Sequence, residues 1–338
     1  MPRSTRAVGA LLAAVAALAL PAPAHAVTTL KLATLAPSGS AWHDLLRELG
    51  QAWEQASGGQ LKVKVYPGGA QGSEGEMIRK LGIGQLQAAA LSNVGLHDVV
   101  PEPQAFSTPL LFADEAELRC AFARVQPSLE AAFERRGLIP VQWSVVGAAS
   151  LFCTTPVGTP EELSRRKLFA WEGDPGSAEA WRAAGFHPVV LSSIDLVPAL
   201  QTGMVDCLAN VPLYVLTAHL FERARHQVDL PWGYLMGAVV VRRDAWEQLP
   251  AELRPRLLEI ARRLGERIDR ESSRLNTGAV EAMRRQGLQT LPADPAAWRG
   301  ALERTWPALR GPVVPAPFFD EVLAARDACR SAGAPPTR

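Results

Sequence analysis

The sequence predicts an α/β protein built as two lobes, with one long helix that touches both. Two separate series of alternating strand and helix patterns predict the lobes, and a long β segment lies between the two series. A helical pattern of roughly 30 residues follows the second series, and a helix of that length extends about 45 Å, more than one small lobe needs. We therefore expect this helix to brace both lobes.

The first series of elements has the order strand, helix, strand, helix, strand. Leu61, Val63 and Val65 alternate with polar residues, which is typical of a strand with one buried face, and Pro67-Gly68-Gly69 ends it. Apolar residues at helical spacing predict the intervening helices. The expected strands are 30–35, 60–66 and 86–91, and the expected helices are 40–57 and 73–83.

A helical pattern over 115–136 leads into the middle of the chain. Two β segments follow there, 138–146 and 151–154, separated by Gly147-Ala148-Ala149, and we expect them to form a crossover between the lobes. The expected strands after this crossover are 167–171, 188–191, 205–209 and 239–242, and the expected helices are 177–184, 194–202 and 253–285.

These elements predict the domain organisation. Lobe I is expected to take 27–150 and roughly 236–270, and lobe II to take 151–235 and roughly 271–320. The remaining 321–338 are expected to form a C-terminal tail.

The first 26 residues have the pattern of a secretory signal peptide. They combine a basic start, an apolar run over 7–20 and a small-x-small ending at Ala24-His25-Ala26. The apolar run is too short for a membrane span, which needs about 20 residues. We therefore expect cleavage after Ala26, export to the periplasm and a soluble mature chain.

Charge and cysteine usage limit the possible partners. Lys and Arg number 35 against 34 Asp and Glu, so no bulk charge favours nucleic acid or an anionic membrane, and a small molecule or another protein is the expected partner. The four cysteines are widely spaced. Bridges between Cys120 and Cys329 or between Cys153 and Cys207 are possible in an exported chain, and buried free thiols are the alternative.

Catalytic signatures are missing from the sequence. It contains no GxSxG, HExxH or GxxxxGK[ST] motif, and its six histidines have no metal-ligand spacing. An enzyme would need a nucleophile with a base beside it, and Cys207 has no histidine near it in the sequence. The expectation is therefore a protein without catalytic activity, cofactor or metal.

Aromatic and amide side chains gather instead at strand ends and loops. Open α/β sheets bind ligands beyond the carboxyl ends of their strands, which makes these residues candidates for a binding site. Packing in the core is the alternative for the aromatic residues, and turn capping for the amides. The candidates are Trp42, Asn93, Trp143, Phe152, Phe169, Trp171, Asn210, Trp232 and Tyr234.

The stretch KLFAWEGDPG, 167–176, raises this choice most directly. Because side chains of a strand alternate, Lys167, Phe169 and Trp171 would share one face before the Gly173–Gly176 turn ends the strand. That face is either core or the wall of a site.

Six blocks in order resemble the DctP-type solute receptors of TRAP transporters. The match runs over nearly all of 30–314. The blocks are LATLAPSGSAWH (32–43), SGGQLKVKVYPGGAQGSEGEM (57–77), IGQLQAAALS (83–92), PLLFADEAE (109–117), ALQTGMVDCLANVP (199–212) and RRDAWEQLPAELR (242–254).

The resemblance implies a two-lobed periplasmic-binding-protein fold with a ligand cleft between the lobes and a long helix spanning both. It also implies hinge closure on a small solute and delivery to an integral-membrane permease driven by an ion gradient, with neither catalysis nor nucleic-acid binding. A periplasmic sensor, or a carrier of lipid or another hydrophobic ligand on the same fold, is the alternative.

One position departs from the family. Where members carry an arginine that pairs with the ligand's carboxylate, this chain has Phe169, after Lys167 and Leu168. A carboxylate buried beside Phe169 without a cation would lose its hydration uncompensated. Lys167 could substitute for the arginine, whereas Glu172 and Asp174 would repel an anion and favour a cation or hydroxyl. The ligand is therefore expected not to be a simple carboxylate held by the usual arginine.

The other site residues follow from the same resemblance. Asn210 matches the family's asparagine, and Trp232 and Tyr234 fall where aromatic residues close on the ligand. Trp143 and Phe152 are expected to flank the floor of the cleft.

Overall fold

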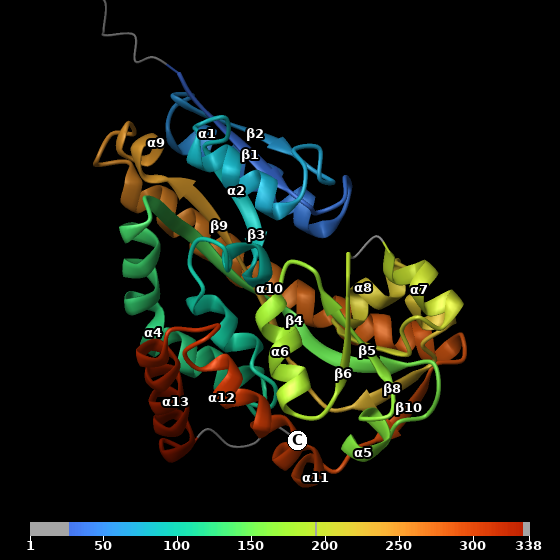
Figure 1. The fold of residues 1–338 in the computed structure, drawn as a ribbon. Coiled ribbons are helices and arrows are strands. Elements are labelled where there is room, and N and C mark those ends of the chain that lie inside the picture. Colours follow the sequence, from blue (N-terminus) through green and yellow to red (C-terminus); the bar gives the residue numbers. More distant parts are fainter. Residues whose placement is uncertain (1–26, 193–194, 334–338) are drawn as a thin grey trace, which may run out of the picture.

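The computed structural model describes residues 27–192 and 195–333 (Figure 1). The expected signal peptide, 1–26, lies outside these residues, and so does Ile194, the expected first residue of one helix. Over the described ranges, none of the helices combines the length and apolar character that a bilayer crossing requires.

The upper half of the molecule in Figure 1 is built on a sheet with the strand order β2-β1-β3-β9-β4. β1 pairs in parallel with β2 and with β3, whereas β9 pairs antiparallel with β3 and with β4. The strands are β1 (Thr28–Thr34), β2 (Leu61–Tyr66), β3 (Ala88–Ser92), β4 (Leu138–Cys153) and β9 (Gly233–Arg242).

The lower half continues the same sheet in the order β4-β7-β5-β6, with β8 attached to β4 and β10 attached to β8. β5 runs parallel to β6 and β7, so the carboxyl ends of these strands meet at one edge. The strands are β5 (Lys167–Trp171), β6 (His187–Leu191), β7 (Cys207–Asn210), β8 (His226–Asp229) and β10 (Gln289–Pro292). Two α/β lobes sharing β4 confirm the predicted fold class.

Helices connect and cover these strands, and several begin at side-chain caps. Ser40 accepts a hydrogen bond from the N–H of His43, and Ser73 and Glu76 form a reciprocal capping box. The helices up to β9 are α1 (Ala41–Ala56), α2 (Glu74–Gly82), α3 (Asn93–Leu96), η1 (Glu102–Ser107), α4 (Glu115–Arg135), α5 (Pro160–Leu163), α6 (Pro175–Ala183), α7 (Leu196–Thr202), α8 (Pro212–Thr217) and η3 (Leu220–Glu222).

The remaining helices follow β9. They are α9 (Arg243–Glu247), α10 (Arg254–Arg285), α11 (Pro295–Leu302), η4 (Glu303–Thr305), α12 (Trp306–Leu309) and α13 (Ala316–Ser331).

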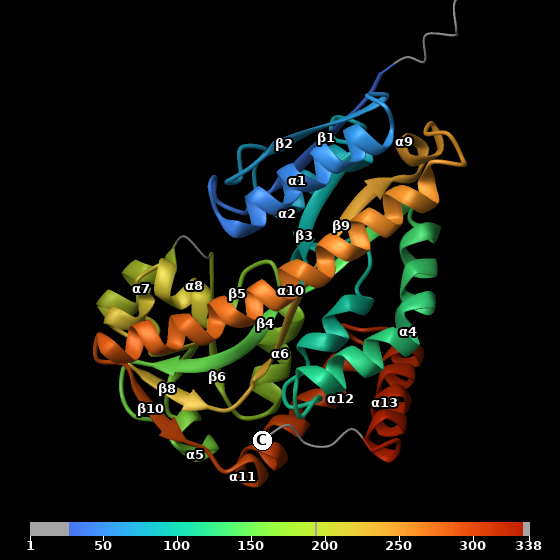
Figure 2. The ribbon, with the colours of Figure 1, turned by 180° about the vertical axis from the view of Figure 1, so that it is seen from behind.

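Helix α10 crosses both lobes, as the sequence predicts (Figure 2). Near its start Leu257 packs in the core that contains α1, and the indole of Trp53 donates to the Leu257 carbonyl at 3.0 Å. Near its end Met283 packs in a core of the second lobe. Between them, Asp269 accepts from the N–H of Val145 at 2.9 Å and Asn276 donates to the carbonyl of Val146 at 2.9 Å. The helix is therefore attached to β4 where that strand passes from one lobe to the other.

The crossover differs from the sequence prediction of two β segments. β4 is one strand of 16 residues, with an irregular register between Val145 and Gly147. Pairing with β9 continues past this point, which keeps the strand intact. Gly147 has a φ of 153°, and a Cβ there would lie 2.6 Å from the amide nitrogen of Asn276. A glycine at this position therefore allows the close approach of α10.

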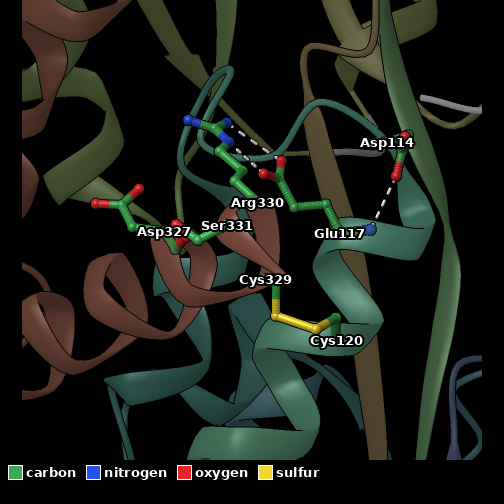
Figure 3. Close-up of a disulfide and its surroundings, with 7 residues drawn as sticks. All are labelled: Asp114, Glu117, Cys120, Asp327, Cys329, Arg330 and Ser331. Carbon is green, nitrogen blue, oxygen red and sulfur yellow. Dashed lines mark hydrogen bonds and ion pairs between the residues drawn. A yellow bond between two sulfur atoms is a disulfide. The ribbon is translucent and has the colours of Figure 1, made fainter. Parts of the chain in front are cut away.

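Within the described residues, the segment predicted to begin a C-terminal tail at 321 belongs to a helix as far as Ser331. Helix α13 extends to Ser331 and packs on α4, with Phe318, Phe319 and Val322 in the core of the first lobe. A disulfide joins Cys120 of α4 to Cys329 of α13 (Figure 3). Beside it, Arg330 of α13 forms an ion pair with Glu117, which lies one helical turn before Cys120 on α4. The helical spacing of the apolar residues over 318–329 was the signal for this helix.

The second possible bridge is also present. Cys153 at the end of β4 is bonded to Cys207 at the start of β7, and both residues are buried in the core of the second lobe. The alternative of free thiols is therefore wrong for all four cysteines.

Candidate functional site

A pocket lies between the two lobes, at the carboxyl ends of β5 and β7. Its volume of about 130 Å³ has room for several water molecules or a small ligand. The first lobe contributes Val94, Gln104 and Ser107, and the strands β4 and β9 that join the lobes contribute Ala149, Gly233, Tyr234 and Leu235. The second lobe contributes Leu168, Phe169, Ala170, Trp171, Asp174, Ser177, Trp181, Ala209, Asn210, Val211 and Trp232.

Strand geometry explains why these residues meet. β5 and β7 are parallel neighbours, so Trp171 and Asn210 leave the sheet at the same edge. β9 begins beside them, because Gly233 pairs with Ala149 of β4. A cleft at such an edge is where open α/β sheets bind ligands.

Aromatic rings form much of the pocket wall. Phe169 and Trp171 meet edge to face, with centroids 6.4 Å apart. Trp181 of α6 packs against Trp232 at 5.2 Å, and Trp232 in turn against Trp298 at 5.7 Å. The aromatic part of the wall therefore consists of two packed groups, Phe169 with Trp171 and Trp181 with Trp232.

A chain of hydrogen bonds crosses the pocket from one lobe to the other. The side-chain amide of Asn93 donates to the Gln104 Oε1 at 2.9 Å, and the Gln104 Nε2 donates to the Asp174 Oδ2 at 3.3 Å. Asn93 also donates to the hydroxyl of Ser107 at 2.5 Å, and that hydroxyl donates to the carbonyl of Tyr234 at 2.9 Å. These hydrogen bonds fix the side chain of Gln104 so that its Nε2 donates to Asp174.

Asp174 is the N-cap of α6 and is only 6 % exposed. Its Oδ1 accepts from the N–H of Ser177 at 3.0 Å, and its Oδ2 accepts from the Ser177 hydroxyl at 2.5 Å. All the groups that contact this carboxylate are thus donors. They hold it as an acceptor at the edge of the pocket.

The pocket wall contains one acid and, over the described residues, neither lysine nor arginine. Lys167 does not replace a missing arginine: it lies at the opposite end of β5, where its exposed ammonium bonds to the carbonyl of Gly203. Glu172 is exposed and does not line the pocket. The negative charge of Asp174 therefore faces the pocket without a basic residue in the wall to balance it.

The ten residues expected from the sequence fall into three groups. Six line the pocket: Phe169, Trp171, Asp174, Asn210, Trp232 and Tyr234. Asn93 is fully buried directly behind it, where it holds Gln104 and Ser107.

The other three pack in cores away from the pocket. Trp42 packs against the core beneath α1, and Trp143 meets Phe122 and Phe133 edge to face at 5.5 and 5.3 Å. Phe152 is fully buried in a core of the second lobe. Trp143 and Phe152 do lie on the crossover strand, but their side chains point into the layers beside it instead of into the cleft.

Several pocket residues were missed by the sequence analysis. Gln104 and Ser107 lie in η1, a segment without a periodic pattern, and Trp181 and Ser177 lie on α6 instead of at a strand end. The N-cap position of Asp174, three residues before Ser177, was the one local signal that the start of α6 faces the same cleft.

The loop that carries Asn93 is held by a carboxylate. Glu74 accepts from the backbone N–H of Ser92 at 2.6 Å and from its hydroxyl at 2.7 Å, and burial raises the pKa of Glu74 above its usual range.

Within the described chain, no group of three His, Cys, Asp or Glu residues is arranged to hold a metal ion. The residues that line the pocket offer hydrogen-bonding groups, one charged group and aromatic rings to a ligand.

Comparison with known proteins agrees with this geometry. The chain is 26 % identical over 255 residues to the C4-dicarboxylate-binding periplasmic protein DctP of Rhodobacter capsulatus, covering 74 % of this chain and 76 % of that protein. Its fold matches a TRAP periplasmic solute binding protein of Ochrobactrum anthropi, with a TM-score of 0.82, 21 % identity and coverage of 91 % and 98 % of the two chains.

A second solved structure has the same fold. It is a TRAP periplasmic solute binding protein of Xanthobacter autotrophicus with bound β-D-galacturonate, with a TM-score of 0.79, 17 % identity and coverage of 88 % of this chain and 99 % of that one. The family model of bacterial extracellular solute-binding proteins, family 7, matches residues 32–310. Because this match covers most of the sequence, the chain belongs to the DctP family of bacterial extracellular solute-binding proteins.

Proposed function

We propose that this chain is a periplasmic receptor that binds one small solute between its lobes and delivers it to a TRAP-type membrane permease. The observation that carries the proposal is the aromatic pocket at the carboxyl ends of β5 and β7, to which both lobes contribute hydrogen-bonding side chains. Binding rather than catalysis fits this wall, which combines aromatic rings with amide and hydroxyl groups. The relatives in the family are likewise solute-binding proteins.

Hinge closure is part of the proposal. The irregular stretch of β4 at Val145–Gly147 is a natural pivot, since the regular pairing of the strand is interrupted there. Asp269 and Asn276 attach this stretch to α10, which keeps the two lobes in register as they move. The lobe boundaries predicted from the sequence, near 150, 236 and 270, stay predictions.

Export and delivery complete the proposal. The predicted signal peptide over 1–26 would direct the chain to the periplasm, where a receptor meets solutes before they reach the membrane. The permease partner is inferred because the solved structures with the same fold are named TRAP periplasmic solute binding proteins.

Native mass spectrometry of the protein isolated from the periplasm of its own cells tests this function. We expect one non-covalent small molecule per chain, released when the protein is denatured. Adding the molecule back at about 100 times its Kd should stabilise the protein by about 2.7 kcal/mol. A protein that carries no small molecule and is stabilised by no component of a periplasmic extract would contradict the proposal.

A further inference from the structure

Asp174 is a buried carboxylate that faces a cavity without a cationic partner. Its contacts over the described residues are the N–H and hydroxyl of Ser177 and the amide of Gln104, none of which carries a charge. A buried charge is costly unless an opposite charge compensates it. The pocket beside Asp174 is where such a charge would be placed.

Capping of α6 alone does not require this placement. Asp294 caps α11 in the same way, by accepting from the N–H of Ala296 at 2.9 Å, yet Asp294 is exposed. Asp174 differs because it is 6 % exposed and also accepts from Gln104, which belongs to the other lobe. The carboxylate is therefore held in the cleft by an arrangement that a helix cap does not need.

The same arrangement disfavours an anionic ligand. The N-terminus of α6 is the feature of this wall that would attract an anion, but the carboxylate of Asp174 already occupies it. An anion in the pocket would meet this carboxylate, with no lysine or arginine among the described lining residues to offset the repulsion.

The aromatic wall suits a positive charge. Trp171, Trp181 and Trp232 line the pocket together with Asp174, and the face of an indole ring attracts a cation more strongly than other aromatic rings do. A carboxylate among indole rings thus combines two favourable contacts for an alkylammonium group. Neither contact discriminates in favour of a neutral ligand.

The wall also holds a hydrogen-bond donor. The side-chain oxygen of Asn210, which lines the pocket, accepts from the N–H of Val211 at 2.8 Å, which leaves its NH₂ group to a ligand. An oxygen atom on the ligand would give this donor a partner.

We infer that the pocket binds a small organic cation, with its ammonium group against Asp174 and among the tryptophan rings and with at least one oxygen acceptor elsewhere in the molecule. This inference rests on the proposed receptor function and specifies its class of ligand.

Titration of the purified full chain with charged and uncharged probes tests the inference. The organic cations are choline, ethanolamine and acetylcholine, each of which carries an oxygen atom. The uncharged isostere of choline is 3,3-dimethyl-1-butanol, the acids are malate and glucuronate, and KCl supplies the inorganic cation. Tryptophan fluorescence and the melting temperature report binding. We expect at least one organic cation to change both, at a concentration at least ten times lower than any uncharged or acidic probe requires.

Asp174→Asn is the decisive variant, because asparagine also caps helices and keeps the shape of the side chain. We expect it to weaken binding of the cation at least tenfold. Asp294→Asn is the matched control, since it makes the same exchange at the cap of α11 and should leave binding unchanged. If Asp174→Asn fails to fold, the comparison of choline with its uncharged isostere on the unaltered protein still decides the matter.

Several results would overturn the inference. An acid that binds the unaltered protein, and binds Asp174→Asn more tightly, would show that the pocket is an anion site. Equal binding of choline and its uncharged isostere, no response to any organic cation, or a response to KCl equal to that of the organic cations would each contradict it. Binding of an acid or a neutral solute would leave the receptor function intact, whereas native protein that carries no solute would contradict that function itself.

Discussion

Phe169→Arg combined with Asp174→Asn is expected to give the pocket affinity for organic acids. Phe169 is 7 % exposed and lies on β5 beside Trp171, so an arginine there would place a guanidinium in the wall of the cleft. Two charge-assisted hydrogen bonds to a carboxylate contribute about 1.5–3 kcal/mol each, part of which offsets the cost of burying the arginine. We expect malate to bind at least about 100-fold more tightly than to the unaltered protein, as measured by isothermal titration calorimetry.

The second substitution is needed because Asp174 would otherwise pair with the new arginine. Phe169→Arg alone is therefore expected to gain much less affinity for malate than the double variant. Phe169→Met with Asp174→Asn is the control, since it removes the ring without adding charge. If the unaltered protein already binds malate as tightly as the double variant, the absence of a basic group in the pocket wall has no consequence for ligand choice.

Removal of the Cys120–Cys329 disulfide is expected to lower the free energy of unfolding more than removal of the Cys153–Cys207 disulfide. The bridge closes a loop of 209 residues and holds α13 on α4 (Figure 3). A disulfide stabilises a protein mainly by restricting the unfolded chain, typically by about 2–4 kcal/mol and more for a longer loop. We expect Cys120→Ala with Cys329→Ala to lower the free energy of unfolding by an amount in this range, measured with urea.

The second disulfide supplies an internal comparison. Cys153 and Cys207 are separated by 54 residues, so chain entropy predicts that their removal costs about 1 kcal/mol less. Dithiothreitol should bring the unaltered protein to the stability of the variant that lacks both bridges. A double variant of Cys120 and Cys329 with an unchanged urea midpoint would mean that the packing of α13 alone holds the C-terminal segment.

The sequence predicts the fold because strong local patterns carry it. The alternation of Leu61, Val63 and Val65 and the turn that follows them identify a strand without reference to the rest of the chain. The long apolar repeat after Pro255 likewise predicts α10 to within one residue at its start. Helix α13 is not predicted because its stability depends on packing against α4, and the apolar spacing over 318–329 does not indicate the surface on which the helix packs.

The pocket is harder to predict from the sequence because it depends on tertiary contacts. Phe169, Trp171 and Asn210 follow from the rule that parallel strands end at one edge. Gln104 and Ser107 come from an irregular segment between α3 and α4, and only the folded chain brings them to Asp174. Trp143 and Phe152 were predicted to flank the cleft but pack in cores. Their position on the crossover strand does not determine on which face of the sheet each side chain lies.

The sequence and the structure both contribute to the interpretation of Asp174. The sequence places an acid just after a strand end and predicts that it disfavours an anion. The structure adds that this acid is buried, that only donors contact it, and that it lies in a wall with three tryptophans and, among the described residues, no basic group. Charge and burial together, rather than either alone, point to the class of ligand.

A crystal structure of the protein with its bound solute tests the central claim most directly. The account predicts a small molecule in the pocket between the lobes, with a positively charged nitrogen within ion-pair distance of Asp174 and in contact with at least one face of Trp171, Trp181 or Trp232. A carboxylate group of the ligand in that position, or a solute bound outside this pocket, would contradict the account.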